Sequence, residues 1–250
     1  MSPPTTIDLI SKHILSHLPR PHTSRREPPL FIALQGPQGS GKTYITSLLA
    51  QHLSSPPHNL KLATLSLDDL YLPHAKLRRL KEKLYPGNRL LEGRGLPGTH
   101  DLELGIDVLS RLKKISEDES ECPGVVLPVF DKSLHDGEGD RLPPNSDLTI
   151  RGPLDVVIVE GWCMGFSSIS NSTLTTRWQE MTSEEMKMWC SMDHVREVNM
   201  LLDAYEGFWA FFDTFVQVIL NSSLSCRFCW PKAPIRSDLQ IHPLTCPHMR

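Results

Sequence analysis

The chain has 250 residues, of which 39% are apolar, and a formal net charge of −3. This length and composition predict one large domain with a buried core. The charge balance argues against a nucleic-acid surface and a membrane-surface anchor, and no apolar run is long enough to span a bilayer. The N-terminus lacks the parts of a secretory signal, and the cysteines before residue 200 are scattered. We therefore expect a reduced protein of the cytoplasm, with the nucleus also open.

The first predicted element is an amphipathic helix over residues 5–18, whose apolar residues fall on one face. Thr5 and Asp8 offer a capping pair at its start. The chain is expected to have three parts, which are an N-terminal helix and linker over 1–29, a main domain over 30–220 and a tail over 221–250.

Residues 30–49 join an apolar run, a glycine-rich loop and a segment with helical apolar spacing. This order of strand, loop and helix is typical of a P-loop, whose backbone N–H groups and helix dipole bind phosphates. Lys42 can reach the terminal phosphates of ATP, and the Thr43 hydroxyl can bind Mg²⁺. The predicted nucleotide-binding residues are Gly36, Pro37, Gln38, Gly39, Ser40, Gly41, Lys42 and Thr43.

A second strand is predicted over residues 61–67, and it ends on Asp68 and Asp69. Carboxylates at the carboxyl end of a strand beside the P-loop strand lie where open α/β sheets bind ligands. Two functional roles are open, a general base for an attacking hydroxyl or a Mg²⁺ ligand. The structural alternative is an ordinary helix N-cap, and we favour the functional roles.

Residues 74–84 form a predicted basic helix, whose charges we interpret as a solvent-exposed face rather than an anion site. A loop over residues 90–101 then combines three glycines with Arg94, His100 and Asp101. Arg94 could pair with a carboxylate or phosphate of a substrate. Asp101 could instead cap the helix that is predicted to follow it.

A strand is predicted over residues 125–130, and the long polar loop 131–141 that follows is of a kind that is often functional. The strand over residues 154–159 is the most apolar of the chain and ends on Glu160. An acid at the tip of an apolar strand is the Walker B arrangement, and it predicts a carboxylate that holds Mg²⁺ through water.

The remaining expected elements are a serine- and threonine-rich loop over 167–176, helices over 183–192 and 194–205, and a strand over 215–220. The alternation of strands and helices predicts an α/β fold. We expect a three-layer P-loop domain with a mainly parallel central sheet.

Together these motifs resemble the glycerate 3-kinase-like group of P-loop small-molecule kinases, which includes fungal ATP-dependent kinases and is related to uridine kinase, phosphoribulokinase and pantothenate kinase. The resemblance covers roughly residues 7–219. The sequences at 98–101 and 160–162 are far more specific to this group than the P-loop is. The motifs that carry the resemblance lie at residues 36–43, 66–71, 93–101, 131–133, 139–141 and 152–162.

The resemblance implies ATP-dependent phosphorylation of a small hydroxylated metabolite, with a glycerate-like acceptor favoured. It implies that Asp68 is the base or orienter of the acceptor hydroxyl. It also implies that Lys42, with Mg²⁺ held by Thr43 and Glu160, neutralises charge on the moving phosphoryl group. The implied acceptor-binding residues are Asp69, Tyr71, Arg94, His100, Asp101, Asp131, Lys132 and Arg141.

The tail is where the chain departs from this group, whose members continue with an arginine-bearing helical lid and another strand. Residues 221–250 lack clear periodicity, and we expect an alternative, poorly ordered terminus. Lid closure excludes water and completes a kinase site. The alternative function is therefore an ATP-binding protein or slow ATPase with impaired transfer.

The tail also contains four residues with the spacing of a two-cysteine, two-histidine zinc finger, namely Cys226, Cys229, His242 and His248. Two prolines between the histidines interrupt the helix that must present both of them. A tail-mediated zinc or interaction module is therefore the least favoured of the three function classes.

Overall fold

The computed structural model describes residues 5–18, 28–115, 124–145 and 148–219. At its centre lies a sheet of four parallel strands in the order β2, β7, β1, β8. The strands are β1 (Leu30–Gln35), β2 (Leu62–Ser66), β7 (Val156–Gly161) and β8 (Thr214–Gln217). The predicted parallel α/β sheet is thereby confirmed.

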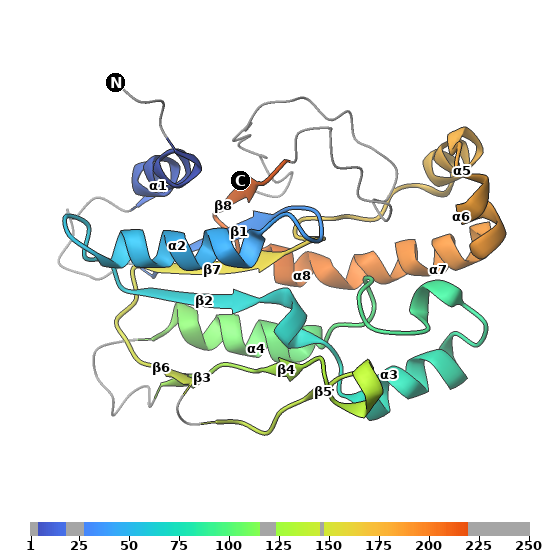
Figure 1. Cartoon of the computed structure of the whole chain (residues 1–250), viewed down its shortest axis with the longest axis horizontal. Coiled ribbons are helices and arrows are strands. Elements are labelled where there is room, and N and C mark those ends of the chain that lie inside the picture. The colour runs from blue at the N-terminus through green and yellow to red at the C-terminus, as the bar shows by residue number, and fades with distance from the viewer. Residues whose placement is uncertain (1–4, 19–27, 116–123, 146–147, 220–250) are drawn as a thin grey trace.

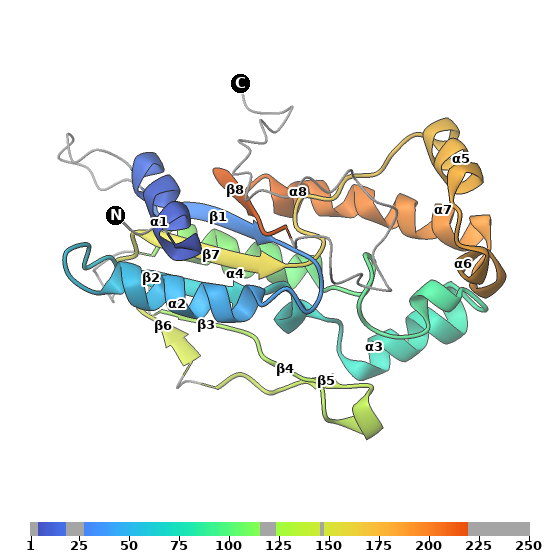
Figure 2. The same cartoon turned by 45° about the horizontal axis from the view of Figure 1, so that its top comes forward.

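Helices cover both faces of this sheet and create three layers (Figures 1 and 2). On one face lie α1 (Thr6–His17) and α2 (Lys42–Ser54), and on the other lie α4 (Leu102–Lys113) and α8 (Glu206–Trp209). Successive strand residues point to opposite faces. Ile158 therefore joins the core with α1 and α2, whereas Val157 and Val159 join the core with α4 and α8. Every residue of β7 is buried, as expected for a central strand that helices cover on both sides.

The N-terminal helix has the predicted cap. Thr5 Oγ1 accepts a hydrogen bond from the Asp8 N–H at 3.2 Å, and the Asp8 carboxylate accepts one from the Thr5 N–H at 2.8 Å. The apolar face of α1 is buried against α2 and the sheet. His13 Nε2 also lies 2.8 Å from Thr214 Oγ1 of β8, which joins this helix to the edge of the sheet.

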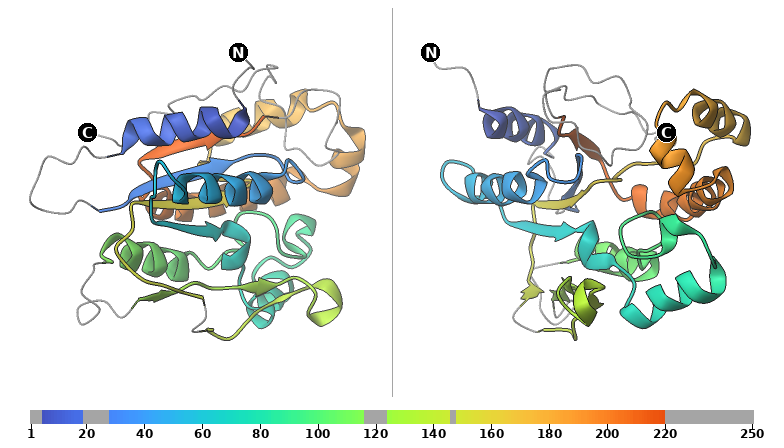
Figure 3. Two further views of the ribbon diagram at one scale, coloured as in Figure 1. Left: turned by 60° about the vertical axis from the view of Figure 1, so that its left-hand side comes forward. Right: turned by 45° about the vertical axis from the view of Figure 1, so that its right-hand side comes forward.

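A second helical region extends beyond the three layers, at the end of the sheet where the strands finish (Figures 1 and 3). It contains α5 (Asn171–Glu180), α6 (Glu184–Trp189) and α7 (Met192–Leu201), followed by the 3-10 turn Leu202–Tyr205. The loop expected over 167–176 is wrong from Asn171 onward. Ser170 caps α5 by accepting a hydrogen bond from the Thr173 N–H at 3.2 Å, and Leu174 is buried in a helical core.

The single strand expected over 125–130 is also wrong, because the segment forms two short strands in separate sheets. These are β3 (Val125–Val126), paired with β6 (Thr149–Ile150), and β4 (Phe130–Asp131), paired with β5 (Asp140–Arg141). Pro128 lies between them and has no N–H to donate, so it interrupts a continuous ladder.

The predicted helix over 74–84 is present as α3 (His74–Arg79), which continues into one wider turn at Leu80–Leu84. Within the described ranges, no helix combines the length and apolar character needed to cross a membrane. The tail over 221–250, with the zinc-finger spacing that includes Cys226 and His242, lies outside the described residues.

Candidate active site

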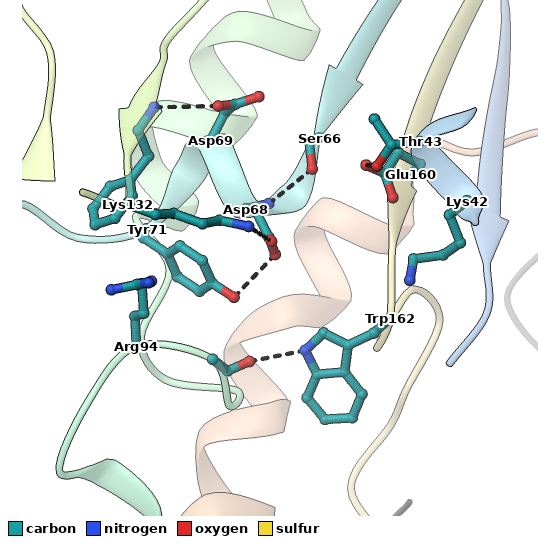
Figure 4. Close-up of polar contacts among 12 residues, drawn as sticks. Lys42, Thr43, Ser66, Asp68, Asp69, Tyr71, Arg94, Lys132, Glu160 and Trp162 are labelled. Atoms are coloured by element: carbon teal, nitrogen blue, oxygen red, sulfur yellow. Dashed lines mark hydrogen bonds and ion pairs between the residues drawn. The ribbon is translucent and has the colours of Figure 1, made fainter. Parts of the chain in front are cut away.

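Three parallel strands end at one edge of the sheet, and the residues that follow them line a single cavity. β1 leads into the glycine-rich loop, β2 leads into a 3-10 turn at Leu67–Leu70, and β7 ends on Glu160 and Gly161. Parallel strands bring their carboxyl ends together, so side chains that are distant in sequence meet here (Figure 4). The cavity volume is about 900 Å³, within the range of small-molecule sites.

The phosphate side of the cavity is formed by the glycine-rich loop and the start of α2. Gly39 and Gly41 have φ values of 78° and 79°, a conformation that glycine adopts without strain. No described side chain caps α2, so its first N–H groups are available to an anion. The Lys42 ammonium donates to the Pro37 carbonyl at 2.9 Å, and burial lowers the pKa of Lys42. The predicted nucleotide-binding residues that line the cavity are Gln38, Gly39, Lys42 and Thr43.

Gly36, the first glycine of the loop, lies where the loop closely approaches the edge of the sheet. A Cβ atom on Gly36 would lie 3.0 Å from both Ser40 Oγ and Val218 Cβ, closer than side chains normally approach. Any larger residue at this position would require Ser40 or Val218 to move by a few tenths of an ångström.

A carboxylate and a hydroxyl meet beside the loop. Thr43 Oγ1 donates to Glu160 Oε1 at 3.0 Å, which joins the start of α2 to the end of β7. Glu160 is only 5% exposed, and a buried carboxylate needs a partner. Both groups are hard oxygen ligands, and Mg²⁺ usually takes one or two such ligands together with phosphates and water. The pair fits Mg²⁺ bound with a nucleotide, and no protein-only metal cluster is present among the described residues.

Asp68 lies across the cavity from Lys42 (Figure 4). Its Oδ1 accepts a hydrogen bond from the Tyr71 hydroxyl at 2.9 Å, and its Oδ2 accepts one from the Lys132 ammonium at 2.5 Å. Burial alone would raise the pKa of Asp68, but the Lys132 hydrogen bond and charge, together with the Tyr71 bond, hold it below its usual value. Asp68 is therefore an ionised, oriented hydrogen-bond acceptor.

Asp69 has a different environment from its neighbour. Its Oδ1 accepts a hydrogen bond from the Phe130 N–H at 3.2 Å, so it attaches β4 to the end of β2. It also lines the cavity. Burial raises the pKa of Asp69, which makes it the less readily ionised member of the pair.

Arg94 is a cation fixed by backbone groups. Its Nη1 donates to the carbonyls of Gly137 and Glu138, each at 2.6 Å, and its guanidinium lies 5.7 Å from the centroid of the Phe130 ring. Among the described residues, no carboxylate forms an ion pair with it. Arg94 therefore presents a positioned charge to the cavity that it lines with Tyr71 and Lys132.

Four predicted acceptor-binding residues lie outside the cavity lining, and each has a partner elsewhere. Asp101 caps α4 and accepts a hydrogen bond from Arg141 at 2.9 Å, while Arg141 also donates to the Tyr71 carbonyl at 2.7 Å. Asp131 accepts hydrogen bonds from the N–H and hydroxyl of Ser133 in a local turn. The fourth, His100, is buried behind Tyr71, whose ring is stacked on it.

Some lining residues were not predicted as site residues. Trp162 donates from its indole N–H to the Gly95 carbonyl at 2.8 Å and bridges the two sides of the cavity (Figure 4). Its place directly after Glu160 and Gly161 was a usable signal. α3 and the wider turn that follows it form a wall that includes His74, Arg78 and Lys81. The sequence offered no signal for this wall, because basic helical faces are usually exposed.

Comparisons with known proteins agree with this geometry. No protein-family model matches the chain. The chain is 38% identical over 166 residues to a Saccharomyces cerevisiae protein named "Probable ATP-dependent kinase TDA10", a match that covers 66% of this chain and 56% of that protein's length. It is 33% identical over 222 residues to the uncharacterized kinase mug58 of Schizosaccharomyces pombe, with 86% of this chain and 73% of the relative covered.

Among solved structures, D-glycerate 3-kinase from Cryptococcus neoformans is 36% identical to the chain and has a TM-score of 0.75. That match covers 87% of this chain and 73% of the solved one. The fission-yeast and Cryptococcus matches both extend far beyond the P-loop and cover more than two thirds of each partner. The chain therefore belongs to the glycerate 3-kinase-like family of P-loop kinases.

Proposed function

We propose that the chain is an ATP-dependent kinase that transfers the γ-phosphoryl group to a hydroxyl of a small hydroxy acid, with D-glycerate as the first candidate. One observation carries this proposal. The cavity that contains the P-loop residue Lys42 also contains Asp68, Arg94 and Lys132. A protein that only binds or hydrolyses ATP has no need for this second set of oriented polar groups.

The phosphate side would hold ATP through the loop N–H groups and Lys42. Thr43 and Glu160 would hold Mg²⁺, which when bound supplies positive charge to the phosphate oxygens. Lys42 would stabilise the negative charge that develops on those oxygens as the phosphoryl group moves.

The acceptor side would supply orientation and a place for the proton. The acceptor hydroxyl oxygen forms a bond to the γ-phosphorus, the bond from this phosphorus to the oxygen that remains with ADP breaks, and the hydroxyl proton passes to the Asp68 carboxylate. The lowered pKa of Asp68 makes it a weak base. Its main contribution is therefore to orient the hydroxyl, as expected for a transition state with little bond formation.

Arg94 would select the acceptor class. A guanidinium without a carboxylate partner among the described residues is suited to a planar carboxylate. A hydroxy acid can place its carboxylate on Arg94 and its hydroxyl at Asp68, whereas an uncharged polyol can satisfy only Asp68. The name of the Cryptococcus relative, a D-glycerate 3-kinase, supports this choice. The cytoplasmic location is part of the same proposal, and the buried free thiols Cys163 and Cys190 support it.

A screen of acceptors tests this function directly. The purified chain is incubated with ATP and Mg²⁺ and with D-glycerate, other hydroxy acids or uncharged polyols, and ADP release and the phosphorylated product are both measured. We expect ADP release to depend on an added hydroxy acid. ATP turnover that is indifferent to every acceptor would instead support the slow ATPase.

The variant Asp68→Asn separates binding from transfer. Asn has a similar shape but lacks the negative charge and has an amide N–H in place of one carboxylate oxygen, so it neither orients the hydroxyl as Asp68 would nor accepts its proton. Transfer should fall by about 100-fold or more, while ATP affinity is unchanged. Asp107→Asn is the matched control, because Asp107 is an exposed residue of α4 outside the cavity lining. Full transfer by Asp68→Asn would refute the role of Asp68.

A further inference from the structure

The turn that precedes α4 packs directly behind Tyr71. The Leu72 N–H donates to the Thr99 carbonyl at 2.9 Å, and the Asp101 N–H donates to the Leu70 carbonyl at 2.7 Å. Tyr71 and His100 are thus opposite each other in a short antiparallel bridge. The backbone around Asp68 is therefore tied to a turn that lies about thirty residues later in the chain.

His100 occupies the centre of this contact. Its ring is stacked on Tyr71, with 4.7 Å between the ring centroids and 21° between the ring planes. Its Nδ1 lies 2.6 Å from the Tyr205 hydroxyl. The Tyr205 oxygen also accepts a hydrogen bond from the Gly98 N–H at 2.8 Å, so one hydroxyl holds both the turn and the His100 ring. Burial lowers the pKa of His100, so the ring is neutral near pH 7, and its Nε2 has no hydrogen-bond partner among the described residues.

Tyr205 attaches this contact to the second helical region. It is fully buried at the end of the 3-10 turn after α7. Gly98, with φ of 98°, has no room for a side chain, because a Cβ atom there would lie 2.4 Å from Leu201 Cδ1. The turn is therefore clamped between α7 and Tyr71, and the orientation of the Tyr71 ring follows from that packing.

We propose that His100 and Tyr205 are positioning residues that orient the Asp68 carboxylate through Tyr71. Tyr205 fixes the His100 ring, His100 fixes the Tyr71 ring, and the Tyr71 hydroxyl fixes Asp68 Oδ1. The buried ring of His100 lies outside the cavity lining, so it acts without touching the acceptor. The catalytic consequence rests on the proposed kinase function, whereas the effect on Asp68 does not.

The physical reason is that a carboxylate with one mobile partner can rotate. Lys132 is half exposed and flexible, so its ion pair with Asp68 does not by itself fix the carboxylate plane. The Tyr71 hydroxyl is carried on a ring that is stacked on one side by His100 and met edge-on by Phe130. A small misorientation of a group that aligns the attacking oxygen lowers the rate of transfer.

The first test measures the pKa of Asp68 by NMR on protein labelled with ¹³C at the aspartate carboxyl carbons, and Asp68→Asn identifies the resonance. Loss of the Tyr71 hydrogen bond in Tyr71→Phe should raise the Asp68 pKa by about 0.5. His100→Asn should raise it by a similar amount, because Asn is neutral and can still hydrogen-bond to the Tyr205 hydroxyl, as donor or acceptor, but lacks the ring. In the Tyr71→Phe background, His100→Asn should add nothing.

The second test measures transfer kinetics with the same variants. Tyr71→Phe should lower kcat about tenfold and leave the acceptor KM within about threefold. Tyr205→Phe, which keeps the ring and removes only one hydroxyl, should lower kcat in the same way. The double variant Tyr71→Phe with His100→Asn should be no slower than Tyr71→Phe alone, because residues that act through one another are not additive.

His13→Asn is the matched control, since it removes a histidine that contacts Thr214 and neither residue lines the cavity. It should leave the Asp68 pKa and kcat unchanged. Equal effects of His100→Asn in both Tyr71 backgrounds, or no effect on the Asp68 pKa, would overturn the proposal. If His100→Asn does not fold, Tyr205→Phe decides the same question. A chain that phosphorylates no acceptor would refute the proposed function, while the NMR titration would still decide the positioning.

Discussion

The two sides of the cavity are built in different ways. The phosphate side comes almost entirely from one continuous segment, residues 36–43, with Glu160 added from the neighbouring strand. The acceptor side is assembled from separate segments that carry Asp68, Arg94 and Lys132. The first side depends on local backbone geometry, whereas the second depends on packing between elements that are distant in the chain.

This difference affects how each side should respond to change. Backbone N–H groups and positive φ values at Gly39 and Gly41 belong to the loop itself. Asp68, in contrast, is oriented by Tyr71 and Lys132, and Arg94 is held by carbonyls of the loop between β4 and β5. Substitutions on the phosphate side should cause the largest losses of transfer, and substitutions on the acceptor side should change specificity and rate by smaller factors.

The largest effect is expected for Lys42→Met, on the phosphate side. Under the proposed function the Lys42 charge would neutralise the moving phosphoryl group, and its loss should lower transfer about 10³-fold. Burial lowers the pKa of Lys42, so the ammonium costs some stability, and the melting temperature should not fall. Steady-state kinetics and thermal unfolding check both statements. If Lys42→Met keeps activity within tenfold of the unchanged chain, the expectation that the phosphate side is the more sensitive side is wrong.

The next largest effect is a loss of folding stability at acid pH, caused by His100 behind the acceptor side. Burial lowers the pKa of His100 to about 4, whereas an unfolded histidine titrates near 6.5. Since the unfolded chain binds this proton more tightly, the free energy of unfolding should fall as the pH drops below about 6.5. The loss should be about 1.4 kcal/mol per pH unit until the curve levels near pH 4, or about 3 kcal/mol in all.

Urea unfolding at several pH values between 7.5 and 4.5 measures this slope. His100→Asn removes this titrating group and should make the slope clearly smaller within that window; burial also lowers the pKa of His13, which accounts for part of the slope that remains. Carboxylates with lowered pKa values, such as Asp68 and Asp101, lose their contribution to the free energy of unfolding only below about pH 4. Their effect therefore falls outside the pH window of this measurement. An unchanged slope in His100→Asn would show that another group controls acid stability.

A smaller effect is expected for Arg94→Lys. The Arg94 Nη1 binds two carbonyls, and under the proposed function the rest of its planar guanidinium would meet the acceptor carboxylate. Lysine keeps the charge but loses this geometry. The acceptor KM should rise about 30-fold, and the KM for ATP should change less than threefold. Arg111→Lys is the control, since Arg111 donates to the Gly124 carbonyl at 3.0 Å outside the cavity lining. Equal changes in both KM values would refute the assignment of Arg94 to the acceptor.

The smallest effect is expected for Ser170→Ala, in the helical region that supports the acceptor side. Loss of the cap at the start of α5 should lower the free energy of unfolding by about 1 kcal/mol. Ser170→Asp, which retains a capping oxygen, should stay within a few tenths. Urea unfolding measures both. A large fall in the transfer rate of Ser170→Ala, measured under conditions where the variant is still folded, would place Ser170 in the acceptor side itself.

The sequence alone predicted much of this molecule, wherever the signal was local. The strand over 30–34, the glycine pattern and Lys42 follow one another in the chain, so the P-loop could be read directly. The Thr5 and Asp8 cap and the buried strand before Glu160 were equally local signals. Membership of the glycerate 3-kinase-like family also followed from contiguous motifs.

Two local predictions failed because a competing local feature was overlooked. Pro128 divides the segment expected as one strand, and Ser170 starts a helix within a run that has the composition of a loop. In both cases one residue's hydrogen-bonding capacity outweighed the average character of its neighbours.

Only the tertiary structure decided which polar residues face the cavity. The family resemblance grouped His100, Asp101 and Arg141 with Arg94 as acceptor-binding residues. The fold places Arg94 in the cavity lining and the other three behind it, where they hold Tyr71 and α4. The order of residues along the chain determines which loops meet at the sheet edge, but the direction of each side chain depends on packing between distant elements.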